Sequence, residues 1–155
     1  MAPRPAPNVR VQAEDFDPGR EQAQLTSDRR DIGALVSFIG LCRDENGALE
    51  SLELEHYPGM AEAEIARVAD QALERWPLQG LTVIHRYGRI PAGERIVLVI
   101  AAARSRADAF AAAEFLMDYL KTRAPFWKKE RRADGASGDW VEAKSEDDNA
   151  AERWR

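Results

Sequence analysis

Apolar residues at helical spacing between residues 60 and 77 limit the fold more than any other feature of this sequence. They recur at intervals of three and four, at Ile65, Val68, Ala69, Ala72, Leu73 and Trp76. This spacing predicts an amphipathic helix, which Pro77 ends because proline cannot continue a helix. Such a helix is stable only when its apolar face packs against another element. The flanking segments must therefore supply an apolar surface.

Those segments have the patterns of β-strands. Residues 32–40 are bounded by glycine and rich in branched side chains, which predicts a buried strand. Residues 49–57 alternate apolar and polar side chains and predict a half-exposed strand, with hairpin-turn residues (D-E-N-G) just before it. Residues 81–87 and 94–103 predict two further strands, separated by R-I-P-A-G as a turn.

A second long helix is predicted over residues 105–122, because Pro125 cannot continue it. Its buried face is expected to contain Phe110, Ala113, Met117 and Leu120. Residues 126–131 and 140–144 then predict the two arms of a hairpin.

Near the N-terminus, residues 9–13 predict a strand, and Asp17 followed by Pro18 predicts the start of a short helix. Elements thus follow the order strand, strand, helix, twice over, and end in a hairpin. This order favours the α+β class and a mixed sandwich of sheet and helices.

Chain length and charge narrow the classes of function. The 155 residues suit one domain, for which we expect a flexible lead-in over 1–8, a single domain over 9–145 and a polar tail over 146–155. A net charge of -5 argues against general binding to nucleic acid or to anionic membranes. No apolar run approaches the roughly 20 residues of a membrane span. The single cysteine permits no internal disulfide, which suits the cytoplasm.

Several kinds of catalytic site lack their usual residues. His56 and His85 lie in separate predicted strands without a ligand-spaced neighbour, so we interpret both as structural and expect no metal and no cofactor. Serine-hydrolase, P-loop and dinucleotide fingerprints do not occur. Cys42 is a possible nucleophile beside Arg43, but a lone cysteine at a strand end is more often a small buried hydrophobe, and we favour that interpretation.

A basic stretch is the strongest indication of a binding site. Residues 121–132 (K-T-R-A-P-F-W-K-K-E-R-R) contain six cations and one carboxylate in an acidic chain. The exposed carbonyl groups at the end of a helix favour cations in its last turn, and this effect alone would account for the cations at the start of the stretch. However, the break at Pro125 lets the chain fold back and direct Lys121 and Lys128 towards one anion. Alternation along the strand would place Lys128 on the face that Phe126 shares.

An alternative is single-stranded nucleic acid, because Phe126 and Trp127 lie among these cations and bases stack on aromatic rings. Acidic residues elsewhere, such as S-E-D-D-N near the C-terminus, would repel a polyanion. A pocket for a small anion, or for the carboxylate end of a partner, is therefore favoured.

Several separated motifs resemble the large, catalytic subunit of molybdopterin synthase. They are L-E-H-Y-P-G-M (54–60), R-W-P-L (75–78), V-I-H-R (83–86) and M-D-Y-L-K-T-R-A-P-F-W-K (117–128), followed by W-V-E-A (140–143). The resemblance covers residues 32–144 in order. It implies an α/β hammerhead fold with an additional small antiparallel β subdomain.

The resemblance also implies an activity and partners. The enzyme family converts cyclic pyranopterin monophosphate into molybdopterin by inserting two dithiolene sulfurs. The sulfur arrives as a thiocarboxylate on the C-terminal glycine of a small ubiquitin-like partner subunit. Two large subunits form a homodimer with a small subunit at each end, a heterotetramer. The anions expected at the basic stretch are thus the thiocarboxylate and the substrate phosphate.

Site residues follow from the same resemblance. Lys121 and Lys128 match the two active-site lysines, and both are expected to catalyse and to bind substrate. Arg43 matches an arginine near the ligand, and Arg106 matches one that the neighbouring protomer contributes. Lys144 stands where the family commonly has arginine.

One position departs from the family pattern. Ser105 stands where the family commonly has a histidine, directly before Arg106. A general acid or base role for that histidine therefore has no counterpart here. This departure leaves open a second alternative, a scaffold that binds its partner without chemistry.

Overall fold

Two four-stranded sheets and three helices make up the described part of the chain, which covers residues 4–44, 47–123, 126–134 and 137–141 together with Glu152 and Trp154 in a computed structural model. Sheet A has, in spatial order, β1 (Asn8–Gln12), β4 (Leu78–Arg86), β6 (Arg95–Ala103) and β2 (Ala34–Leu41). Sheet B has β5 (Gly88–Pro91), β3 (Leu49–His56), β7 (Phe126–Arg132) and β8 (Ser137–Val141). The helices are α1 (Pro18–Thr26), α2 (Met60–Arg75) and α3 (Arg106–Arg123).

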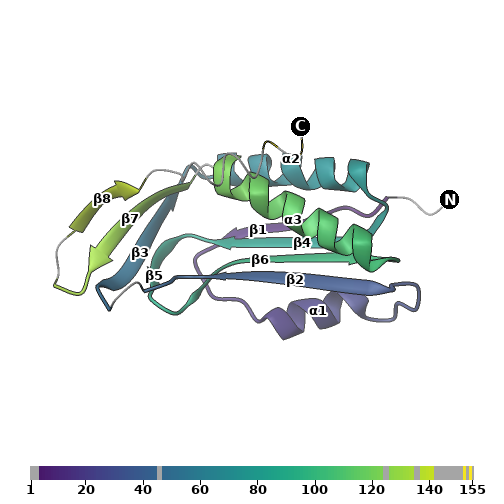
Figure 1. Ribbon diagram of the computed structural model, residues 1–155, viewed down its shortest axis with the longest axis horizontal. Helices are drawn as coiled ribbons and strands as arrows, with labels where there is room; N and C mark the ends of the chain where they lie inside the picture. Colours follow the sequence, from purple (N-terminus) through teal and green to yellow (C-terminus); the bar gives the residue numbers. More distant parts are fainter. Residues whose placement is uncertain are drawn as a thin grey trace.

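Sheet A carries helices on both faces. In Figure 1, α2 and α3 lie on one side of it and α1 on the other, and sheet B extends from one end. Alternation along β4 explains this arrangement, because Val83 packs in the cluster under α2 and α3 whereas Ile84 packs in the cluster under α1. β1 pairs in parallel with β4, and the other ladders of sheet A are antiparallel. The predicted α+β architecture with a separate antiparallel subdomain is therefore confirmed.

The strongest local patterns gave correct elements. Helix α2 buries Ile65, Val68, Ala69, Ala72 and Leu73 as predicted. Trp76, just beyond its end, packs edge-on against Phe115 of α3, with 5.3 Å between the ring centroids. Trp154 packs against the same two rings, with 5.7 Å between its centroid and each of theirs. A residue close to the chain's end therefore covers the contact between α2 and α3.

The C-terminal hairpin is confirmed as the antiparallel pair of β7 and β8, in which Lys128 lies opposite Val141. The second arm begins at Ser137, earlier than predicted. Residues 142–144 of that predicted arm, and Pro125 before the first, lie outside the described residues.

Two predictions about β2 are wrong. Among the described residues it lies at an edge of sheet A and pairs with β6 alone, and the expected burial is incomplete: Phe38 and Ile39 are 40% and 38% exposed. It also forms no hairpin with β3, which belongs to sheet B. The chain leaves one sheet and enters the other between them.

Two further predictions need correction. The stretch expected as a simple turn contains strand β5, which pairs with β3 through Ile90 opposite Leu52. In α3, Phe110 is 61% exposed instead of buried, and Met117 is only partly buried. Ala113 and Leu120 are buried as predicted, and the rest of the buried face is formed by Ala109, Ala112, Phe115, Leu116 and Tyr119. Alanines occur on several sides of this helix, so the sequence pattern does not determine which of its faces is buried.

Gly33 allows the chain before β2 to touch the turn before α3. Its N–H donates a hydrogen bond to the carbonyl of Ala103 at 3.0 Å, and a Cβ placed on it would lie 2.1 Å from the carbonyl oxygen of Arg104. We expect Gly33→Ala to destabilise the fold by about 1–3 kcal/mol, because backbone must move to admit the methyl group. Denaturant unfolding measures this change. Gly19→Ala is the control, because its Cβ would meet Asp17 Oδ1 at an ordinary 3.5 Å; equal losses in both variants would contradict the explanation.

Candidate functional site

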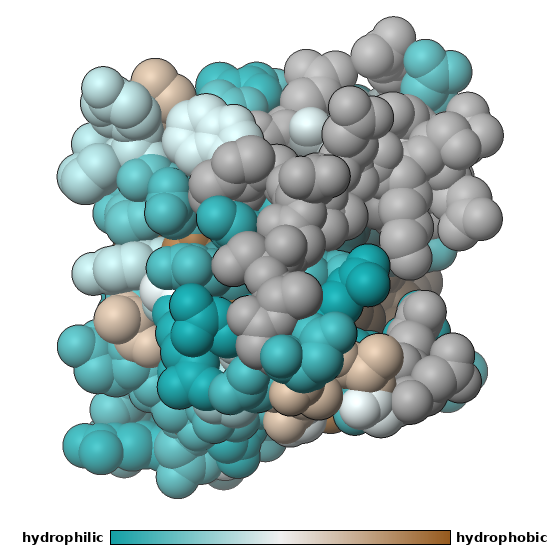
Figure 2. Space-filling view, turned by 90° about the vertical axis from the view of Figure 1, so that its left-hand side faces the viewer, coloured by the Kyte–Doolittle hydropathy of each residue, from teal (hydrophilic) through white to brown (hydrophobic). Residues whose placement is uncertain are grey.

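Both candidate lysines lie where the helical layer meets sheet B. Lys121 is exposed in the last turn of α3, and Lys128 is half-buried in β7. Figure 1 shows α3 running along sheet A and ending beside the start of β7. Charges on both lysines act on one buried side chain, His85, and lower its pKa. Lys121 and Lys128 therefore both lie within electrostatic range of His85, and their convergence on one anion stays a prediction. Hydrophilic residues cover most of the described surface at this end of the molecule (Figure 2).

His85 lies close to the end of β4, with 8% of its surface exposed. Its Nδ1–H donates a hydrogen bond to the carbonyl of Arg86 at 2.8 Å. Burial lowers the pKa of His85 to about 4; the hydrogen bond opposes this shift, while the charges of Lys128, Lys121 and His56 add to it. The imidazole is therefore neutral near pH 7.

Aromatic rings surround this histidine. The Phe126 ring stacks on His85 with 3.9 Å between centroids and 13° between planes. His56, the last residue of β3, lies 5.9 Å from Phe126 and 4.3 Å from Tyr87, centroid to centroid. Sequence reasoning treated the two histidines as unrelated. Their shared position at strand ends was the one signal that could have joined them.

Cys42 and Arg43 follow β2 at the junction of the two sheets. Cys42 is 1% exposed, packs with Leu54 and Ile90 of sheet B, and donates its N–H to the carbonyl of Glu94 at 2.8 Å. Arg43 is exposed. Burial is the main factor that raises the pKa of the Cys42 thiol, so the interpretation of Cys42 as a buried hydrophobe is confirmed.

We therefore expect Cys42 to resist thiol reagents in the folded protein, because the reactive species is an accessible thiolate. Labelling with a chromogenic disulfide reagent at pH 7 should be slow for the native chain and complete after unfolding in denaturant. A small exposed thiol such as glutathione provides the reference rate. Native labelling as fast as that reference would restore Cys42 as a candidate nucleophile.

Arg106 lies far from Lys121 within one chain. It begins α3 and Lys121 lies in the last turn, so about 22 Å of helix separates them at about 1.5 Å per residue. Ser105, just before it, accepts a hydrogen bond at Oγ from the N–H of Asp108 at 3.3 Å and so caps the helix. One protomer thus does not bring Arg106 to Lys121. The remaining candidate, Lys144, lies outside the described residues.

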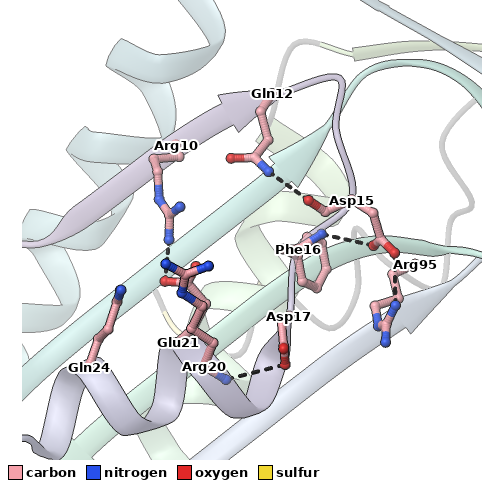
Figure 3. A pocket seen from close by; sticks show the side chains of 9 residues that line it. All are labelled: Arg10, Gln12, Asp15, Phe16, Asp17, Arg20, Glu21, Gln24 and Arg95. Atoms are coloured by element: carbon pink, nitrogen blue, oxygen red, sulfur yellow. Dashed lines mark hydrogen bonds and ion pairs between the residues drawn. The ribbon is translucent and has the colours of Figure 1, made fainter.

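A hollow of about 690 Å³ lies on the other side of sheet A, between β1, α1 and the start of β6 (Figure 3). Two of its three arginines face carboxylates: Arg10 bonds to Glu21, and Arg95 Nη1 lies 2.9 Å from Asp15 Oδ2. These ion pairs make the hollow a weaker anion site than the surroundings of His85.

Two other kinds of feature are absent from the described residues. No group of three histidine, cysteine, aspartate or glutamate side chains there is arranged to hold a metal ion. None of the helices in this part of the chain is long and apolar enough to cross a membrane.

The fold and the side chains at its sheet junction define an α+β hammerhead-type protein with one lysine in the last turn of a helix and another in the strand that follows. Comparison with known proteins then identifies the family. The chain belongs to the MoaE protein family, whose model matches residues 11–123. This is the family of the catalytic subunit of molybdopterin synthase, so the resemblance drawn from the sequence motifs is confirmed and the chain is classed as an enzyme.

Individual relatives agree with this assignment. The chain is 68% identical over 150 residues to the molybdopterin synthase catalytic subunit of Mesorhizobium japonicum, covering 97% of this chain and 94% of the relative. A MoaE protein from Burkholderia ambifaria has a similar structure, with a TM-score of 0.82, 46% identity and coverage of 96% of this chain and 97% of that one. Molybdopterin synthase from Staphylococcus aureus has a TM-score of 0.75 at 30% identity, covering 85% of this chain and 95% of that one.

Proposed function

We propose that the chain converts cyclic pyranopterin monophosphate into molybdopterin by inserting two dithiolene sulfurs. A small ubiquitin-like partner subunit supplies the sulfur as a thiocarboxylate on its C-terminal glycine. The observation that carries the proposal is that Lys121, in the last turn of α3, and Lys128, in β7, both act on the pKa of the buried His85. Two cations suit a reaction in which a thiocarboxylate and a phosphate must lie side by side.

Each lysine has a separate role in this proposal. Lys121, exposed at the end of α3, stabilises the charge that develops as sulfur adds, or protonates the oxygen that leaves. Lys128, half-buried in β7, holds the substrate, and Arg43 and Lys144 are proposed to assist it. Arg106 reaches the pocket from a second copy of the chain, because the length of α3 keeps it away from Lys121 in its own protomer.

The proposed assembly is a heterotetramer of two large and two small subunits. Relatives named as a catalytic subunit support the existence of a further subunit. The cytoplasm is the proposed location, since a reducing compartment suits the free, buried thiol of Cys42.

Reconstituted turnover tests this function. The purified chain is mixed with the thiocarboxylated partner and the cyclic substrate, and dithiolene product is measured; the partner in its carboxylate form is the control. We expect product only with the thiocarboxylate. Tight binding of the partner without any product would identify a scaffold and overturn the proposal.

The nucleic-acid alternative is weakened by the surroundings of Phe126. One face of its ring is covered by His85 at 3.9 Å, so a base cannot stack there. Trp127 remains 49% exposed. Strongly salt-dependent binding to a single-stranded oligonucleotide would revive this alternative.

A further inference from the structure

Phe126 connects the two sheets through its ring. It begins β7 of sheet B, yet it stacks flat on His85, which belongs to β4 of sheet A. His56 of β3 approaches the same ring at 5.9 Å between centroids. The Phe126 side chain is therefore held by histidines that come from different sheets.

The placement of Phe126 bears directly on Lys128. The two residues are two positions apart in β7, so their side chains project from the same face of the strand, about 7 Å apart. Hydrogen bonds of the ladder fix Lys128 opposite Leu54 within sheet B. They do not fix sheet B relative to α3, which packs on sheet A and carries Lys121. The stack of Phe126 on His85 is one contact that joins β7 of sheet B to sheet A.

His85 is well suited to act as a fixed platform. Its ring is oriented by the bond from Nδ1–H to the Arg86 carbonyl. Arg86 is itself held by its guanidinium, which donates from Nε to the carbonyl of Ala13 at 3.1 Å and from Nη1 to that of Arg95 at 2.9 Å. The ring therefore has little freedom to turn.

The neutral state of the ring matters as well. A protonated imidazole here would place a third positive charge beside Lys121 and Lys128 and would raise the cost of burying the ring. Because the pKa of His85 is about 4, the ring carries no proton to donate at Nε2 near pH 7 and is a poor general acid. Its contribution is geometric.

We propose that His85 is a positioning residue: its imidazole, stacked on Phe126, sets strand β7 against helix α3 so that Lys121 and Lys128 face one anion. The inference rests on the proposed function for the identity of that anion. The geometry itself can be tested without turnover.

Three variants separate this role from general stability. His85→Phe keeps a flat, neutral ring and loses the ring nitrogens. His85→Leu keeps apolar volume and loses the stack. Ile84→Ala is the matched control, because Ile84 is the fully buried neighbour on the same strand and packs in the cluster on the opposite face of sheet A. Thermal unfolding of each variant sets an assay temperature at which all are folded.

The first measurement uses inorganic phosphate as the probe. Lysine side chains labelled with ¹³C report binding by nuclear magnetic resonance, with Lys121→Arg and Lys128→Arg variants assigning the signals. In the wild type, both signals should move together with a single dissociation constant. We expect His85→Leu to weaken this binding by about fivefold or more, while His85→Phe and Ile84→Ala stay within about twofold of the wild type.

The second measurement is turnover with the thiocarboxylated partner. His85→Leu should lower kcat by about 10- to 100-fold, the range in which a small misplacement of a reacting group acts. His85→Phe should restore most of the loss, and Ile84→Ala should keep the wild-type kcat.

Distinct results would overturn the inference. Unchanged phosphate binding in a folded His85→Leu variant would do so, as would equal defects in His85→Phe and His85→Leu, which would assign the effect to the ring nitrogens. A wild type that binds phosphate through both lysines but never forms product would refute the proposed function alone. The phosphate titrations would then still decide the role of His85.

Discussion

Lys121→Ala is expected to reduce dithiolene formation by about 10²- to 10⁴-fold, the range typical of one positioned acid or charge-stabilising group. Lys121 lies in the last turn of α3, and its charge acts on the same buried histidine as that of Lys128. Removing it leaves the developing negative charge with a single lysine. Single-turnover assays with the thiocarboxylated partner measure the loss in the chemical step.

The matched control for this prediction is Lys129→Ala. Lys129 lies in β7 beside Lys128, but alternation along the strand directs its side chain to the opposite face. We expect this variant to retain activity within about threefold of the wild type. If Lys121→Ala formed product at the wild-type rate, Lys121 would have no part in the mechanism. If Lys129→Ala were equally inactive, the loss of activity would reflect the total positive charge of this region and not the position of Lys121.

Mixing two inactive variants, Arg106→Ala and Lys121→Ala, is expected to restore about a quarter of wild-type activity. Random exchange makes half of the dimers mixed, and each mixed dimer has one pocket with both residues intact. The physical basis is the length of α3, which holds Arg106 about 22 Å from Lys121 of the same chain. A site that needs both residues must therefore combine two copies.

Subunit exchange has to be measured in the same experiment. Fluorescence energy transfer between separately labelled wild-type dimers establishes the time needed for mixing. After that time, a mixture with no more activity than its parents would exclude a shared site. Recovery of activity by Arg106→Ala alone at high substrate concentration would instead assign Arg106 to substrate binding without a role in catalysis.

Local signals accounted for the parts of the fold that were predicted correctly. The spacing from Ile65 to Trp76 defined α2 because an amphipathic face needs no distant information. The edge position of β2 was not predictable in this way. Its sequence resembles a buried strand, and within the described residues β6 is the one strand that pairs with it.

For the candidate site as well, some features could be predicted from local sequence and others could not. Lys121 and Lys128 were found because they lie close together in the sequence and match a family motif. The stack of His85 on Phe126 was not found, because it joins strands of different sheets and depends on how those sheets meet. Strand order and sheet membership arise from non-local contacts, which a pattern of neighbouring residues does not encode.

The division of the chain between its sheets has a consequence for the order of folding. In the part of the chain that the structure describes, the strands of sheet A lie within the first 103 residues, whereas sheet B includes β7 and β8 at 126–141. Pairing of β3 with β7 closes a long loop, since Leu54 pairs with Lys128, about half of the chain length away. Loops of this kind close late in folding. The entropic cost of bringing their ends together must be met before the contacts between those ends can form. During synthesis from the N-terminus, sheet A can therefore form on the ribosome while the lysine site still lacks one wall. Active protein should appear only after the final hairpin has emerged and docked.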